Sequence, residues 1–196
     1  MPRVSEDHLT ARREQILAAA RACFLRNGLH ATTMQDLIRE ADLSIGAVYR
    51  YFKSKNEIIS AIAEQVAGGI TVRIQEIAAQ QPPVPLADAM DQVLDLIEAQ
   101  VGPGGNFPLG VQVWGEATID PAIGDIVRER YAGMHRAFEI MAERAAGRGE
   151  LPAGSDPAAV GAVLFSMVPG FALQRMIIGK PDKETFAAGV RTILAR

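Results

Sequence analysis

The sequence predicts an all-α protein with about nine helices. Apolar residues recur at helical spacing through nearly the whole chain, and no stretch of useful length alternates as a half-buried strand does. Clusters of proline and glycine at 81–85 and 102–105 separate the helical segments. With 196 residues, of which 48% are hydrophobic and 22% charged, the chain is globular and long enough for one or two modest domains.

The first helix is expected to be short, and longer helices follow residue 55. QPPVP at 81–85 ends the long helix that begins near Lys55, because proline lacks an amide hydrogen and disfavours helix at the residue before it. Asp120-Pro121 and Asp156-Pro157 are start signals, with aspartate as the N-cap and proline at the first helical position. The apolar stripes cover approximately residues 16–24, 58–77, 86–101, 107–119, 126–141, 160–177 and 182–195.

Two further short helices, separated by a tight turn, lie before residue 55. The pair Thr32-Thr33 supplies the cap of the first, and Thr32 and Gln35 have the spacing of a capping box. Asp42-Leu43 forms the turn, and Ser44 caps the second helix over Ile45–Phe52. This is the helix-turn-helix pattern, in which the second helix enters the major groove of DNA.

The composition of this second helix fits contact with DNA. Ser44 and the first amides of the helix can donate to a phosphate. Gly46 leaves room for the backbone to approach the duplex, which gives a reason for its cost of about 1 kcal/mol against alanine. Tyrosine hydroxyls and Lys55 can reach phosphates. Arginine pairs with guanine and small apolar groups contact the thymine methyl, so the candidates for base contacts are Ile45, Ala47 and Arg50.

The distribution of charge agrees with a DNA-facing front. Residues 1–55 carry nine lysines and arginines against six acidic residues, whereas residues 56–196 carry eleven against seventeen. A basic N-terminal segment and an acidic C-terminal segment indicate a part that binds a polyanion, joined to a second part with a different function. Chance variation accounts for a difference of this size equally well.

Residues 13–58, REQILAAARACFLRNGLHATTMQDLIREADLSIGAVYRYFKSKNEI, resemble the TetR family of transcriptional regulators. Over residues 59–196 the resemblance rests mainly on the helix pattern, with VWGEATIDPAIGDIVRERY and GELPAGSDPAAVGAVLFSMVPGFALQRM similar to segments of the family's C-terminal half. The resemblance implies a three-helix DNA-binding domain over residues 1–55 and a helical bundle for ligand binding and dimerisation over residues 56–196.

The family pattern also implies roles for individual residues. Two positions depart from it: Asp42 stands where many relatives have glycine, and Ile45 where many have lysine or arginine. Aspartate tolerates the left-handed conformation that such a turn needs, whereas the loss of a cation at Ile45 alters base preference. The resemblance implies phosphate contacts from Thr33, Ser44, Tyr49, Tyr51 and Lys55, and base or groove contacts from Ile45, Gly46, Ala47 and Arg50.

For the rear bundle, the resemblance implies a mostly apolar ligand cavity and a dimer interface on the last two helices. Read residue by residue, an ordinary bundle core explains the same side chains equally well. A two-fold dimer has its own logic, because one short helix reads too few base pairs. The expected cavity residues are Met90, Leu94, Trp114, Met134, Phe138 and Phe171, and the expected interface residues are Val163, Met167, Phe186 and Val190.

Other classes of site and location are excluded or disfavoured by the sequence. The single cysteine, Cys23, allows no intrachain disulfide. One cysteine and three scattered histidines also disfavour a zinc site of the Cys/His type. We find no HExxH sequence, nucleophile elbow or Walker loop, and therefore expect neither an enzyme nor a cofactor. The N-terminus lacks the apolar region of a signal peptide, and no apolar run approaches the roughly 20 residues of a membrane helix. We expect a cytoplasmic protein with no membrane partner.

These observations lead to three hypotheses about function. The first is a homodimeric repressor that binds a near-palindromic operator in double-stranded DNA and is released by a small, largely apolar effector. In the second, the DNA-binding regulator has no small ligand and is controlled by a protein partner or not at all. The third is a helical binding protein whose front no longer binds DNA.

Overall fold

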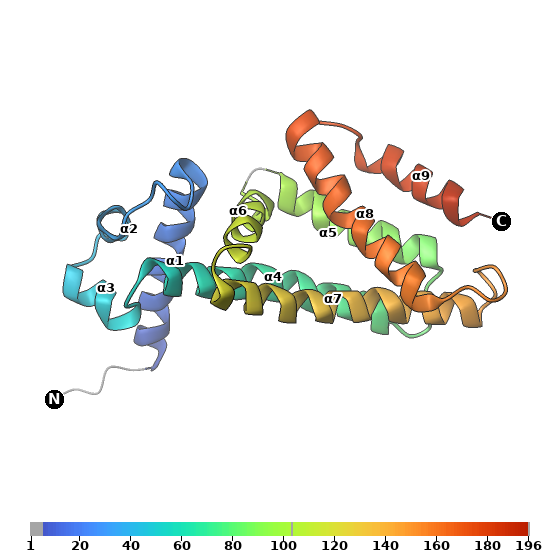
Figure 1. Cartoon of the computed structure of the whole chain (residues 1–196), viewed down its shortest axis with the longest axis horizontal. Helices are drawn as coiled ribbons and strands as arrows, with labels where there is room; N and C mark the ends of the chain where they lie inside the picture. Colours follow the sequence, from blue (N-terminus) through green and yellow to red (C-terminus); the bar gives the residue numbers. More distant parts are fainter. Residues whose placement is uncertain (1–5, 103, 196) are drawn as a thin grey trace. The chain divides into compact units, whose positions relative to one another are not determined.

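In the computed structural model, which describes residues 6–102 and 104–195, the chain is all-α (Figure 1). The predicted fold class is confirmed, and within the described residues the helices number nine. Their bounds are α1 Glu6–Asn27, α2 Met34–Glu40, α3 Ile45–Tyr51, α4 Lys55–Ala79, α5 Leu86–Val101, α6 Phe107–Ala117, α7 Pro121–Gly147, α8 Pro157–Ile178 and α9 Lys183–Leu194. The prediction that the first helix is short is wrong, since α1 has 22 residues.

Packing divides the chain into two compact units. The N-terminal unit contains the residues up to Val66 together with Leu109–Val127, and the C-terminal unit contains Ala67–Pro108 and the residues from Arg128 onward. The divisions therefore fall inside α4, α6 and α7. The expected boundary between residues 55 and 56 refers to the functional parts of the chain and stays a prediction.

A single apolar core holds the N-terminal unit together. Buried side chains of α1, α2, α3 and the start of α4 meet those of Leu109, Val113 and Ile123. Because α2 and α3 have only seven residues each, neither is stable alone, and burial of one face in this core fixes them. The other principal members of the core are Ile16, Leu17, Ala20, Cys23, Phe24, Leu29, Leu37, Val48, Phe52, Ile58, Ile59 and Ile62.

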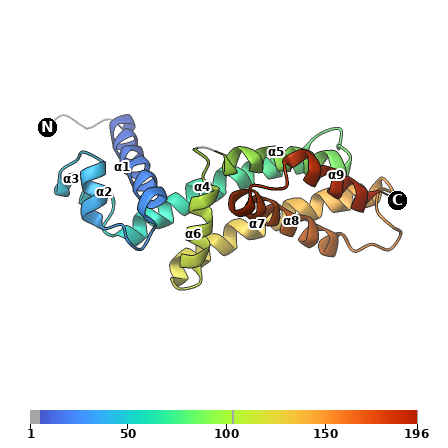
Figure 2. The same cartoon turned by 90° about the horizontal axis from the view of Figure 1, so that it is seen from above.

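In the C-terminal unit, α5 packs against both α8 and α9 (Figure 2). The strongly amphipathic α5 buries its apolar stripe and places acidic residues at 88, 91, 95 and 98 along its length. Arg175 in α8 pairs with Glu98. Lys183 and Arg191 in α9 pair with the remaining three carboxylates, Asp95, Asp88 and Asp91. These ion pairs join α8 and α9 to α5, and because they are partly or fully exposed each contributes little energy.

The start signals that we identified cap the helices as predicted. Asp120 and Asp156 accept hydrogen bonds from the first backbone amides of α7 and α8. Gly179 ends α8 in the left-handed conformation, at a φ of 76°. Asp182 then caps α9 by accepting from the Thr185 amide at 2.8 Å.

Helix α8 corrects our expectation about apolar runs. It has 22 residues and is long and apolar enough, by length and composition, to cross a membrane. Only 33% of its most apolar stretch is buried within the chain. A single helix of this kind is weak evidence for a membrane span, because the core helix of a soluble protein passes the same test.

Gly161 in α8 offers a test of the packing between α7 and α8. A Cβ atom at this position would lie 2.8 Å from the backbone of Glu139 and 3.1 Å from that of Phe138. We expect Gly161→Ala to lower the free energy of unfolding by about 1–3 kcal/mol, because the backbone of α7 must move away.

The matched control is Gly69→Ala in α4, where a Cβ atom meets nothing within 4 Å. This change is expected to raise stability by up to about 1 kcal/mol through helix propensity. Chemical denaturation of both variants measures the difference. Equal stability of the two variants would contradict the close approach of α7 and α8.

Candidate nucleic-acid interface

Helix α3 has one buried and one exposed face. Val48 and the following Phe52 are buried in the core of the N-terminal unit, and the guanidinium of Arg13 lies 5.3 Å from the centre of the Phe52 ring. On the opposite side, Ile45 is 65% and Tyr49 39% exposed. Gly46, Arg50 and Lys53 are exposed there as well. A surface of about two helical turns is therefore available to a partner.

The turn between α2 and α3 has the geometry that a helix-turn-helix requires. Asp42 adopts the left-handed conformation, with a φ of 51°, which agrees with our expectation that aspartate can replace glycine here. The amide of Leu43 donates to the carbonyl of Ile38 at 3.4 Å. The Ser44 hydroxyl oxygen accepts from the Ala47 amide at 3.2 Å, so Ser44 is the N-cap of α3 as predicted.

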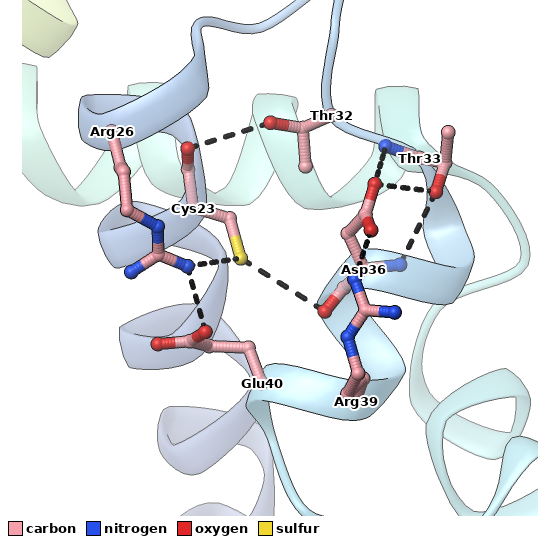
Figure 3. A network of polar contacts seen from close by, with 7 residues as sticks. All are labelled: Cys23, Arg26, Thr32, Thr33, Asp36, Arg39 and Glu40. Carbon is pink, nitrogen blue, oxygen red and sulfur yellow. Dashed lines mark hydrogen bonds and ion pairs between the residues drawn. The ribbon is translucent and has the colours of Figure 1, made fainter.

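The cap of α2 is made by Thr33 and Asp36 (Figure 3). The Asp36 amide donates to the Thr33 hydroxyl oxygen at 3.2 Å, and the Thr33 amide donates to the Asp36 carboxylate at 3.0 Å. The hydrogen bond from the Thr33 hydroxyl, with that from its amide, lowers the pKa of Asp36. The predicted capping box of Thr32 and Gln35 is wrong. Thr32 is fully buried and donates its hydroxyl to the carbonyl of Gly28 at 2.8 Å.

A polar network joins α1 to α2 behind this cap (Figure 3). The Arg26 guanidinium donates to Glu40 at 2.7 Å and to the sulfur of Cys23 at 3.6 Å. Cys23 is buried, as predicted, and burial together with the nearby Glu40 carboxylate raises the pKa of its thiol. A thiol that stays protonated is a weak nucleophile, so Cys23 acts as a core residue here.

Lys55, at the start of α4, binds the loop that connects α1 and α2. Its ammonium donates to the carbonyls of Leu29 at 2.9 Å and Thr32 at 3.1 Å, with His30 at 3.5 Å. The proposed phosphate contact of Lys55 stays a prediction, and it competes with this structural role. Lys53 is exposed on the surface next to α3, where its ammonium donates to the carbonyl of Tyr49 at 2.5 Å.

Residues of α6 also hold this loop, a contact that no pattern in the sequence indicates. The Gln112 side chain accepts from the Leu29 amide at 2.9 Å and donates to the Phe24 carbonyl at 3.3 Å. One turn later along α6, Glu116 lies 3.3 Å from the imidazole of His30. Since these partners are more than 80 positions apart in the chain, no local pattern could have predicted the contacts.

The two predicted tyrosine contacts differ in their surroundings. Tyr51 is half-buried and packs against the core of the N-terminal unit, whereas Tyr49 is on the exposed face of α3. Within the described part of the chain, the Arg50 side chain is exposed and no hydrogen bond or ion pair holds it. Arg50 and Tyr49 are therefore accessible to a partner, and the phosphate contact expected of the half-buried Tyr51 stays a prediction.

The residues predicted for a ligand cavity fall into both units. Trp114 belongs to the N-terminal unit, and the other five belong to the C-terminal unit, where they are buried. The rings of Phe138 and Phe165 have centroids 5.9 Å apart, and those of Phe171 and Phe186 lie 4.9 Å apart. Such contacts are typical of a packed core, and the role of these residues in ligand binding stays a prediction.

Open grooves in the C-terminal unit are lined by other residues. One, of about 390 Å³, lies between the start of α5 and the end of α9 and includes Leu86, Glu150, Arg191 and Leu194. Another, of about 330 Å³, lies between α4 and α5 and includes Arg73, Gln80 and Gln92. None of our predicted cavity residues lines these two grooves.

The predicted dimer residues also differ in exposure. Val163 is 56% exposed on α8, and Met167 and Phe186 are partly exposed. Val190 is only 4% exposed and packs within the chain's own core, and its role in a dimer interface stays a prediction. One apolar stripe on α9 is already used for packing within the chain. Other large apolar residues on α8 and α9 are exposed, namely Ile177, Ile178 and Ile193.

Comparison with known families agrees with this geometry. Residues 16–62 match the family described as "Bacterial regulatory proteins, tetR family", and residues 107–196 match "BetI-type transcriptional repressor, C-terminal". Together the two matches cover more than half of the chain. The chain belongs to the TetR family of transcriptional regulators, which is a non-enzymatic family.

Among curated relatives, an HTH-type transcriptional repressor of Mycobacterium tuberculosis is 43% identical over 65 residues. The match covers 33% of this chain and 35% of that protein, so the chain spans about a third of the length of this relative.

Solved structures share the fold over nearly the whole chain. Salmonella enterica GusR has a TM-score of 0.78 at 24% identity, with 98% of this chain and 97% of that chain covered. A transcriptional regulator from Saccharomonospora viridis in complex with choline has a TM-score of 0.78 at 18% identity, covering 94% and 96%. FadR from Bacillus subtilis in complex with stearoyl-CoA has a TM-score of 0.74 at 18% identity, covering 93% and 97%.

The role of Lys55 can be separated from that of Lys53 by substitution. We expect Lys55→Met to lower the free energy of unfolding by about 1–2 kcal/mol, because charge-assisted hydrogen bonds to the α1–α2 loop are lost. Lys53→Met removes one hydrogen bond, to the carbonyl of Tyr49, that is exposed to water, so it should change stability by less than about 0.5 kcal/mol. Thermal or chemical unfolding measures both. A Lys55→Met variant as stable as the wild type would show that the ammonium does not hold the loop.

Proposed function

We propose that this TetR-family protein is a homodimeric, cytoplasmic repressor that binds a near-palindromic operator and is released by a small, largely apolar effector. The observation that carries the proposal is the exposed face of α3, which presents Ile45, Tyr49 and Arg50 while Val48 and Phe52 anchor the helix from behind. In helix-turn-helix proteins, the equivalent surface enters the major groove.

The contacts with DNA fall into two classes in this proposal. Thr33, Ser44, Tyr49, Tyr51 and Lys55 are the candidates for phosphates, and such contacts set the position of the protein on the duplex. Ile45, Gly46, Ala47 and Arg50 are the candidates for base edges. Gly46 is consistent with close approach of the backbone, because nothing of the chain lies within 4 Å of the place where its Cβ would stand.

A two-fold dimer explains the exposed apolar surface of α8. Val163, Met167 and Ile177 lie on this helix, and it buries little of its most apolar stretch within the chain. Contiguous apolar surface of this kind marks a protein interface in most soluble proteins. A dimer would present two copies of α3 to two half-sites, which multiplies the specificity of one short helix.

Regulation by a small effector is supported by the relatives. Two proteins that share the fold are complexes with choline and with stearoyl-CoA. The helices of the C-terminal unit supply apolar side chains suited to an apolar ligand, and methionine adapts its shape well. An effector that prefers the state unable to bind the operator would shift the equilibrium by a coupling free energy of about 1–3 kcal/mol.

The alternative is a DNA-binding regulator without a small ligand, controlled by a protein partner. The ring contacts of Phe138 with Phe165 and of Phe171 with Phe186 favour this alternative, because such contacts are typical of a packed core. The two alternatives share the same DNA contacts and differ only in what controls them.

Replacement of Arg50 tests the proposed base contact of α3. We expect Arg50→Ala to reduce discrimination between the operator and single-base variants by about 1–3 kcal/mol, because a base contact is lost. Arg73→Ala removes an exposed arginine of α4 that pairs with Glu76, and it should leave discrimination unchanged. Fluorescence anisotropy over a range of salt concentrations measures both affinity and its salt dependence. Unchanged discrimination in Arg50→Ala would refute the base contact, and no affinity for any duplex at low salt would refute the function.

Replacement of Val163 tests the dimer. We expect Val163→Glu to convert dimers into monomers, since two buried carboxylates would face each other near a two-fold axis. Val72→Glu is a matched control, because Val72 on α4 is 52% exposed compared with 56% for Val163. Light scattering coupled to gel filtration gives the mass of each variant. A dimeric Val163→Glu variant would place the interface elsewhere. A monomeric wild type would refute the dimer.

A ligand screen tests control by an effector. Uncharged apolar compounds, choline and stearoyl-CoA are each added to the protein, and the midpoint of thermal unfolding is recorded. A ligand at 100 times its Kd stabilises the native state by about 2.7 kcal/mol. We expect at least one apolar compound to raise the midpoint and to lower affinity for the operator. Stabilisation by choline alone would change the proposed class of effector, and no stabilisation by any compound would favour control by a partner.

A further inference from the structure

Ile45 is an apolar side chain on the exposed face of α3. It is the first residue of α3 and is 65% exposed, so its branched side chain contributes little to the core of the N-terminal unit. Single exposed apolar residues are common on protein surfaces. This one stands on the face of the helix that the proposed function places in the major groove.

Ile45 can recognise a base only in a limited way. Tyr49 lies four positions later and therefore on the same side of the helix. Gly46 carries no side chain, and the space beside it is open for 4 Å around the position of a Cβ atom. Ile45 itself has no group that donates or accepts a hydrogen bond, so it can select a base only by apolar contact.

The major groove offers one apolar group for such contact. Each base pair presents donors and acceptors there, and thymine alone adds a methyl group, at C5. Removal of one buried methyl group from an apolar contact weakens binding by about fourfold. A contact of this kind distinguishes thymine from cytosine and from uracil without any hydrogen bond.

We propose that Ile45 is a specificity residue that reads the C5-methyl group of a thymine in each half-site of the operator. The proposal rests on the proposed function, because it requires α3 to lie in the major groove. It predicts a thymine at the base pair that faces the first turn of α3, and a preference there that depends on the methyl group alone. Contact of Ile45 with deoxyribose would instead give affinity without this preference.

The test uses deoxyuridine, which differs from thymidine only by the missing methyl group. An operator is first selected with the wild-type protein from a pool of random duplexes. Each thymine of one half-site is then replaced by deoxyuridine in turn, and affinities are measured by fluorescence anisotropy at constant salt. We expect one position at which replacement in a single half-site weakens the wild-type protein by about fourfold.

Two variants complete the experiment. In Ile45→Ala, the difference between thymine and uracil at that position should disappear, while thermal unfolding stays close to that of the wild type because the side chain is exposed. Ile119→Ala is the matched control, since Ile119 is 71% exposed in the same unit but lies outside α3. This control should retain the full difference.

The outcomes separate this inference from the proposed function. Duplex binding that is intact, with equal affinity for every uracil-substituted operator, overturns the methyl contact and leaves the function standing. A thymine preference that persists in Ile45→Ala assigns the contact to another residue and overturns the role of Ile45. Absence of binding to any duplex at low salt overturns both.

Discussion

The burial of Val48 and Phe52 is the interaction on which the proposed DNA-binding surface depends. Helix α3 has two turns, too few for a helix to persist in water without support. Its inner residues insert into a core formed by α1, α2 and the start of α4, and this packing determines which residues face outward. The positions of Ile45, Tyr49 and Arg50 are therefore a consequence of hydrophobic packing on the opposite side of the same helix.

A second constraint acts on the loop between α1 and α2. This loop has backbone carbonyls and amides that no helix satisfies, and buried groups of this kind need partners. Lys55 from α4 and Gln112 from α6 provide them, through hydrogen bonds to the carbonyls and amides of residues 24–32. The loop is thus held from two directions, and with it the start of α2, whose cap is made by Thr33 and Asp36.

Local signals in the sequence predicted helices and caps well and failed where tertiary packing decides. The turn at Asp42 and the cap at Ser44 depend only on neighbouring residues, and both were correctly predicted. The choice between Thr32 and Thr33 as a cap was missed, because it depends on which of the two faces the core. The burial of Val190 within the chain was not foreseen, because an apolar stripe on a helix looks the same whether it packs within a chain or between chains.

The composition of the N-terminal unit limits how the chain can be divided. Its core includes Leu109, Val113 and Ile123, which lie far along the sequence from the helix-turn-helix. A fragment that ended at residue 66 would lose these side chains and the Gln112 amide, and it would expose to water the apolar surfaces that they cover. The DNA-reading part is therefore not a detachable module: during synthesis it cannot complete its core until residues beyond 123 have left the ribosome.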